Sequence, residues 1–161
     1  MNLLDQYKIV PLLSPADLGG SADSNAIDMQ NVHHATIMWS FGAITPNSSV
    51  YARLIVEKAD DAAFSVNQSN IEIAGSLSDD VMGDEDSDLF GTSISCDANQ
   101  TYITMTGAFV NKAFLYEIPA TILAGSRYIR VRIGDQSTAT FASATAVLKM
   151  RARVITTVLV E

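Results

Sequence analysis

Residues 126–135, SRYIRVRIGD, alternate with a period of two between polar or aromatic side chains and aliphatic ones. In an extended chain this alternation puts Tyr128, Arg130 and Arg132 on one face and the aliphatic residues between them on the other. Such a segment is typical of a β-strand that covers an apolar core with one face and meets water or a partner with the other. The stretch therefore predicts a sheet protein.

The same pattern recurs along the chain between clusters of turn-forming residues. In VYARLIVEKA (50–59), Arg53 and Glu57 flank Ile55 on one face, and the other face is aliphatic. Polar turns such as TPNSS, GDEDSD and GDQS separate the runs. Further strands are expected in ATIMWSFGAI (35–44), TYITMTG (101–107), KAFLYEIP (112–119), ATFASATAVL (139–148) and RARVITTVLV (151–160).

Short strands without alternating helices predict a mainly β class, an antiparallel β-sandwich or a barrel-like single domain. A length of 161 residues suits one core. We expect an extended N-terminal arm in residues 1–26, because Pro11 and Pro15 interrupt regular structure, followed by the β-sandwich domain in residues 27–161. One local alternative is a short helix that begins at Asp60, since acids favour a helix N-terminus.

Acidic residues outnumber basic ones by 18 to 10, which gives a net charge of −8 and a pI near 4.5. This sign of charge argues against nucleic acid as a partner. No run of about 18 apolar residues could span a bilayer, and the N-terminus lacks the basic-then-apolar order of a signal peptide, so no membrane partner is expected. Cys96 is the only cysteine, which excludes an intrachain disulfide.

Charge is unevenly placed along the chain. Residues 1–126 hold four basic and sixteen acidic residues, whereas residues 127–161 hold six basic and two acidic ones. The basic residues of the second segment form a strip on adjacent predicted strands: Arg127, Arg130, Arg132, Lys149, Arg151 and Arg153. Two interpretations stay open. The strip faces an acidic partner surface, including a second copy of the chain, or its members pair with acids within the chain.

No pattern in the sequence points to catalysis, so we expect neither an enzyme nor a cofactor. His33 and His34 are neighbours on a predicted strand and point to opposite faces, which prevents them from binding one metal ion together. No serine lies in a Gly-x-Ser-x-Gly turn, and no glycine-rich phosphate loop is present. Trp39 lies in an apolar run and is expected in the core.

The acidic run DDVMGDEDSD (79–88) is a candidate cation site. Asp84, Asp86 and Asp88 have the one-three-five spacing of an EF-hand loop, whose carboxylates bind calcium. Leu89 and Ser95 stand where that loop requires Gly and Glu, so an EF-hand is excluded. Calcium binding in another geometry and a solvated acidic loop are the two remaining interpretations.

The order of several short motifs resembles a family of small capsid-associated virion proteins of tailed bacteriophages. In that family a strand ending in Gly-Ala-Ile/Val precedes an acidic segment with a Phe, then a basic strand with Tyr, then an Ala/Val-rich strand that ends in basic residues. The matching positions are Gly42-Ala43-Ile44, Val56–Asp61 with Phe64, Arg127–Arg130, and Ala146–Leu148 with Arg151. Relative to the family, residues 76–113 resemble an acidic insertion, and RVITTVLVE (153–161) extends past the usual end.

The resemblance implies a structural virion protein without catalytic residues. Its expected role is a capsid decoration or cement protein, made in the cytoplasm of the host bacterium, that binds the major capsid protein on the exterior of the virion. A homo-oligomer is expected, with a trimer favoured because capsids offer threefold sites. The N-terminal residues Tyr7, Lys8 and Ile9 and the arginines 127, 130 and 132 are the expected contact residues.

Two other functions remain open from the sequence. A head-neck or tail component would share the same inert β domain but occupy a different layer of the virion. A calcium-dependent carbohydrate-binding module would use the acidic run as its ligand set and exposed aromatic rings to stack on sugar.

Overall fold

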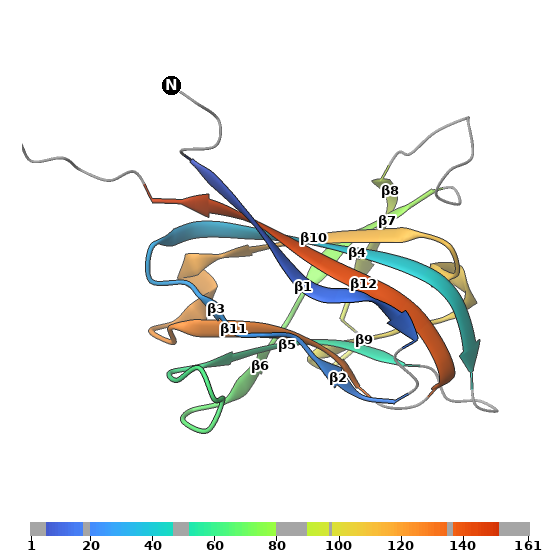
Figure 1. Cartoon of the computed structure of the whole chain (residues 1–161), viewed down its shortest axis with the longest axis horizontal. Coiled ribbons are helices and arrows are strands. Elements are labelled where there is room, and N and C mark those ends of the chain that lie inside the picture. Colours follow the sequence, from blue (N-terminus) through green and yellow to red (C-terminus); the bar gives the residue numbers. More distant parts are fainter. Residues whose placement is uncertain are drawn as a thin grey trace, which may run out of the picture.

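The computed structural model describes residues 6–17, 20–46, 52–79, 90–96, 98–134 and 137–151. Within these residues the chain folds into two six-stranded antiparallel sheets that pack face to face as a sandwich (Figure 1). The prediction of a mainly β, sandwich-like single domain is confirmed. No helix among the described residues is long and apolar enough to cross a membrane.

Sheet A contains the longest strands, and every neighbouring pair in it is antiparallel. Its order is β1-β12-β4-β10-β7-β8. The strands are β1 (Tyr7–Asp17), β12 (Ser137–Met150), β4 (Val32–Pro46), β10 (Ala113–Pro119), β7 (Ala74–Ser78) and β8 (Phe90–Ser95). Consequently β1 and β8 form the two edges of this sheet.

Sheet B is built around two central strands, β11 (Tyr128–Gly134) and β5 (Arg53–Ala59). Short strands pair with their outer sides, β2 and β3 with β11 and β6 and β9 with β5. These are β2 (Ala22–Asp23), β3 (Ile27–Asp28), β6 (Ser69–Ile71) and β9 (Tyr102–Thr104). Two short 3-10 helices, η2 (Gly107–Phe109) and η3 (Ala120–Leu123), lie on either side of β10 in the sequence.

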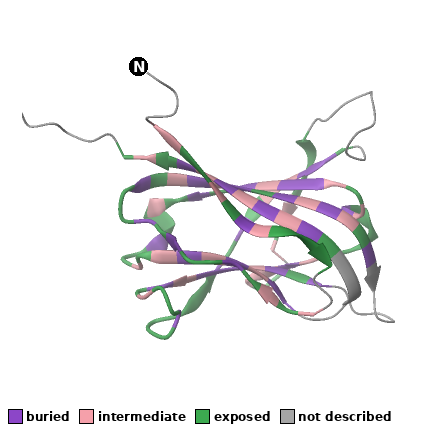
Figure 2. Ribbon diagram, in the orientation of Figure 1, coloured by how far each residue is buried: buried purple, intermediate pink, exposed green. Residues whose placement is uncertain are grey.

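The core lies between the two sheets and contains several buried aromatic rings that pack against one another. Trp39 is fully buried, as expected, and its ring stacks on Phe41 at a centroid distance of 5.7 Å. The indole Nε1 donates a hydrogen bond of 3.3 Å to the hydroxyl of Tyr116, and burial raises the pKa of that tyrosine. Buried and exposed residues alternate along the strands, which leaves one face of each sheet outside the core (Figure 2).

Residues 7–17, predicted as part of an extended arm, form instead the edge strand β1. Eight Cα partners join β1 to β12, with bulges between Pro11 and Leu13 and between Leu13 and Ala16. The backbone N–H of Met150 donates to the carbonyl of Gln6, so alternation points the backbone groups of Tyr7, Ile9 and Pro11 away from β12. Proline is tolerated there because its missing N–H falls on the open edge.

Two further local expectations are corrected. Residues 60–66 form turns rather than a short helix, because the carboxylate of Asp61 accepts hydrogen bonds from the N–H groups of Ser65 and Val66 and closes a tight loop. The segment 76–113, expected as an acidic insertion, also supplies the edge strand β8. The strand expected in residues 101–107 is confirmed as the short strand β9, which pairs with β5 in sheet B.

Candidate functional site

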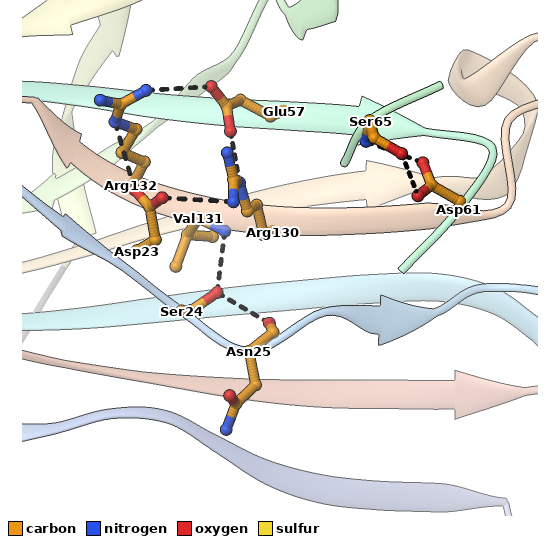
Figure 3. A network of polar contacts seen from close by, with 9 residues as sticks. All are labelled: Asp23, Ser24, Asn25, Glu57, Asp61, Ser65, Arg130, Val131 and Arg132. Atoms are coloured by element: carbon orange, nitrogen blue, oxygen red, sulfur yellow. Dashed lines mark hydrogen bonds and ion pairs between the residues drawn. The ribbon is translucent and has the colours of Figure 1, made fainter. Parts of the chain in front are cut away.

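The outer face of sheet B carries a compact ionic network formed by Asp23, Glu57, Arg130 and Arg132 (Figure 3). Arg130 pairs through Nε with Glu57 and through Nη1 with Asp23 at 3.2 Å. Arg132 reaches Asp23 at 3.2 Å and Glu57 at 3.4 Å. Each guanidinium thus contacts both carboxylates, and each carboxylate contacts both guanidinium groups.

This network follows from register. Arg130 lies directly opposite Glu57 on β5, and Arg132 lies directly opposite Asp23 on β2, so four alternating charges meet on one face. Glu57 is buried with 3% of its surface exposed, although it lies on the outer side of the sheet. Two guanidinium groups offset the charge of this buried carboxylate, and each of its oxygens has one guanidinium contact.

An aromatic side chain covers the same network. Phe64, from the loop after β5, places its ring 4.4 Å from the guanidinium carbon of Arg130 and is itself buried. The loop is held by Asp61, whose carboxylate accepts from the backbone and hydroxyl of Ser65, and these bonds lower the pKa of Asp61. Below the network, Ser24 joins the β2–β3 connection to β11 by accepting a 3.0 Å bond from the N–H of Val131 (Figure 3).

Arg127 also has an acidic partner within the chain. Its Nε and Nη2 donate to the two carboxylate oxygens of Asp28 at 3.0 and 2.6 Å. The hydrogen bonds from Arg127 lower the pKa of Asp28, and the same contact raises the pKa of Arg127. Of the two interpretations of the basic strip, the structure shows intrachain pairing for Arg127, Arg130 and Arg132.

The outer face of sheet A differs in kind. The described residues in the middle of this face include no charged residue. We call these residues the neutral face: Ile9, Pro11, Thr36, Met38, Ser40, Leu115, Phe141, Ser143, Thr145 and Val147. Three of its apolar side chains are substantially exposed, Ile9 by 66%, Met38 by 40% and Phe141 by 48%. Isolated exposed apolar residues are ordinary, but a cross-strand group of them is typical of a contact surface.

Of the expected N-terminal contact residues, Tyr7 and Ile9 lie on the outer face of sheet A. Lys8 lies between them and, by alternation, points to the opposite side of β1. Ile9 pairs across the strands with Val147 and so belongs to the neutral face, whereas Tyr7 pairs with Lys149 at its end. The structure therefore places one of the three predicted residues, Ile9, in the neutral face, and Tyr7 lies at the end of that face.

The neutral face is bounded by polar residues and hollows. At one end Tyr7, His34 and Lys149 help to line a shallow hollow of about 300 Å³, where His34 lies 3.2 Å from Glu117. At the other end an apolar hollow of about 350 Å³ lies beside Phe141, whose Cβ packs close to Gly42. Both hollows are open, as in a surface that docks against another surface rather than enclosing a small molecule.

Among the described residues no group of three His, Cys, Asp or Glu side chains could hold a metal ion. His33 and His34 lie on β4. Asp84, Asp86 and Asp88 lie outside the described residues.

No protein-family model and no curated protein matches the chain. Among solved structures, the chain is similar to the crystal structure of the SPBc2 prophage-derived protein YomS. The TM-score is 0.48 and the sequence identity 9%, over 88% of this chain and 93% of that chain.

Proposed function

We propose that this protein is a structural virion protein of a tailed bacteriophage, a decoration protein that binds the outer surface of the major capsid shell and stabilises it. The neutral face is the observation that carries the proposal, because it is a broad outer surface with exposed Ile9, Met38 and Phe141 and no charge in its middle. The family resemblance of the strand motifs supplies the identity of the partner.

Docking by the neutral face explains how so small a domain would strengthen a shell. Covering apolar surface is favourable, and contacts between neighbouring capsomers must then be broken together with the contacts to the decoration protein. Many copies on one shell add their modest contacts, provided that they engage at the same time. The net charge of −8 suits an external position, since an acidic protein does not trap DNA.

The proposal is tested on purified heads prepared without this protein. Adding the full chain should raise the temperature at which heads release their DNA, and Met38→Asp should abolish the gain by placing a charge in the contact. Val66→Asp is the matched control, because Val66 is similarly exposed but lies on the loop after β5. Equal release temperatures with and without the full chain would show that it does not cement the shell.

A head-neck or tail component is the second candidate, because the same neutral face would serve a ring or a fibre equally well. Copy number per virion separates the two. Hundreds of copies support the shell, and about six to a dozen, as closed rings contain, support the neck or tail.

A further inference from the structure

The edges of the two sheets are protected to different degrees. Edge strands expose unpaired backbone N–H and C=O groups, and proteins usually block them by keeping the strand short or by adding proline or charge. The edge strands of sheet B have two or three residues each, and β1 of sheet A carries Pro11 at a position whose backbone faces outward. Among the described strands, β8 is therefore the long edge that lacks these forms of protection.

Strand β8 lies at the edge of sheet A with β7 on one side (Figure 1). Its six residues, FGTSIS, contain no proline and no charge, and in the part of the chain that the structure describes no strand pairs with its outer side. The N–H of Cys96 donates to the carbonyl of Ile73. Alternation along β8 therefore points the backbone groups of Ser93 and Ser95 away from β7, where a further strand would pair with them.

The two ends of β8 differ in shape. At its first residue, Phe90 is 40% exposed. Beyond its last residue lies an open hollow of about 460 Å³, whose lining includes Ile122, another apolar residue that is 40% exposed. From β8 and the segment after it, the lining includes Ser95, Cys96, Ala98 and Asn99. One edge strand thus has an exposed ring at one end and a hollow with an exposed apolar side chain at the other.

Phe90 and the hollow open to the same face of sheet A. Phe90 pairs with Ser78 on β7. Ser95 pairs with Ala74, and both of these residues line the hollow. On β7, Ala74 and Ser78 alternate with Leu77, which belongs to the core, so they lie on the outer face. Residues directly opposite each other across a strand pair share a face, which places Phe90 and Ser95 on the outer face as well.

A second copy of the chain fits both ends of β8 at once. Antiparallel pairing of β8 with the same strand of another copy places the first residue of each strand beside the last residue of the other. Each Phe90 then meets the hollow beside the other copy's Ile122, and the contact occurs twice. A strand of a different protein would have to supply both a ring and a hollow, whereas symmetry supplies them here. Because β8 is uncharged, the pairing buries no charge of that strand, although each chain has a net charge of −8.

We propose that β8 pairs antiparallel with β8 of a second copy, with Phe90 of each copy in the hollow beside Ile122 of the other. The two-fold axis of this pair is perpendicular to the sheet, so the outer faces of both copies of sheet A point to the same side. Both neutral faces are then available to one partner surface. The inference goes beyond the proposed function and is tested on the purified protein without heads, so its failure and the failure of the capsid proposal are distinguishable.

Replacing the ring should separate the copies. By size-exclusion chromatography with light scattering, the unmodified chain should be a dimer and Phe90→Asp a monomer, because burying a carboxylate beside Ile122 would strip its water without providing a partner. Val66→Asp is the matched control. It places the same charge on another exposed apolar residue, on the loop after β5, and should remain a dimer. An unmodified chain that is a monomer or a trimer, or a dimer that survives Phe90→Asp, would overturn the proposal.

Amide hydrogen exchange identifies the strand that joins the copies. In the unmodified dimer the N–H groups of residues 92–95 should all be protected from exchange. In Phe90→Asp the N–H groups of Ser93 and Ser95 should exchange rapidly, and those of Thr92 and Ile94, which face β7, should stay protected and so show that the variant is folded. The measurement on the unmodified chain is decisive even where the variant fails to fold. A dimer in which Ser93 and Ser95 exchange rapidly is joined by another surface, and this result would refute the pairing of β8.

Discussion

The outer faces of the two sheets differ in whether their side chains are covered and paired within the chain. On sheet B, Arg130 and Arg132 form ion pairs with Asp23 and Glu57, and Phe64 covers Arg130, so these four charges are paired within the chain. On sheet A the neutral face leaves Ile9 and other apolar side chains exposed. The difference shows that charged residues on a strand can be paired within the chain, and under the proposed function the neutral face is the surface that binds a partner.

Removing Glu57 should give the largest loss of stability among surface-side residues. Glu57→Ala leaves two guanidinium groups with only Asp23 between them, and we expect the free energy of unfolding to fall by about 2–3 kcal/mol. Urea unfolding measures it. Glu117→Gln on sheet A, which removes a more exposed charge near His34, should cost less than about 0.5 kcal/mol. Similar losses at both positions would erase the contrast between the faces.

Removing the aromatic cover should have the next largest effect. Phe64→Ala exposes the Arg130 guanidinium and loses a buried ring, which should lower the free energy of unfolding by about 1.5 kcal/mol. Phe64→Leu keeps most of the apolar area but not the ring, so the difference between the two variants measures the contribution of the ring itself. If Phe64→Ala left the free energy of unfolding unchanged, the ring of Phe64 would not stabilise sheet B.

Acid should weaken the ion pair between Asp28 and Arg127 on sheet B. The hydrogen bonds from Arg127 lower the pKa of Asp28, so this pair stabilises the folded state above the ordinary pKa of an aspartate, about 4, and the contribution is lost as the pH falls through the lowered value. Because the pair is partly exposed, Asp28→Asn should cost about 0.2–1 kcal/mol at pH 7. The cost should vanish in unfolding experiments well below pH 4, and a cost independent of pH would contradict the pairing.

The sequence predicted the strands well but not which residues meet across them. Alternation in residues 126–135 identified Ile129 and Val131 as core and Arg130 as outward, because a period of two is a local property. The network with Glu57 and Asp23 depends on β5 and β2 flanking β11, which is a matter of topology. Glu57 was recognised only as a polar residue of its strand, since no local signal distinguishes a paired buried carboxylate from a solvated one.

The expectation of an extended arm is wrong for residues 7–17, for a related reason. Proline was interpreted as a break, yet an edge strand has one side on which a missing N–H costs nothing, and Pro11 lies on that side. The neutral face was also beyond local reasoning. It combines residues of β1, β12, β4 and β10, and each of these strands by itself is an ordinary half-polar strand.

The smallest effect on stability should come from a charge placed in the middle of the neutral face. Thr145 lies between Pro11 and Met38 in the cross-strand register and is half-buried, so a lysine at this position can extend into water. Thr145→Lys should change the free energy of unfolding by no more than about 0.5 kcal/mol. The same variant should lose most of its occupancy on heads, because a contact would have to bury the ammonium group without a partner. Asn70→Lys, on the sheet B side opposite Glu57, is the control that should keep full occupancy. If Thr145→Lys kept its occupancy on heads and Asn70→Lys lost it, sheet B rather than sheet A would carry the contact surface.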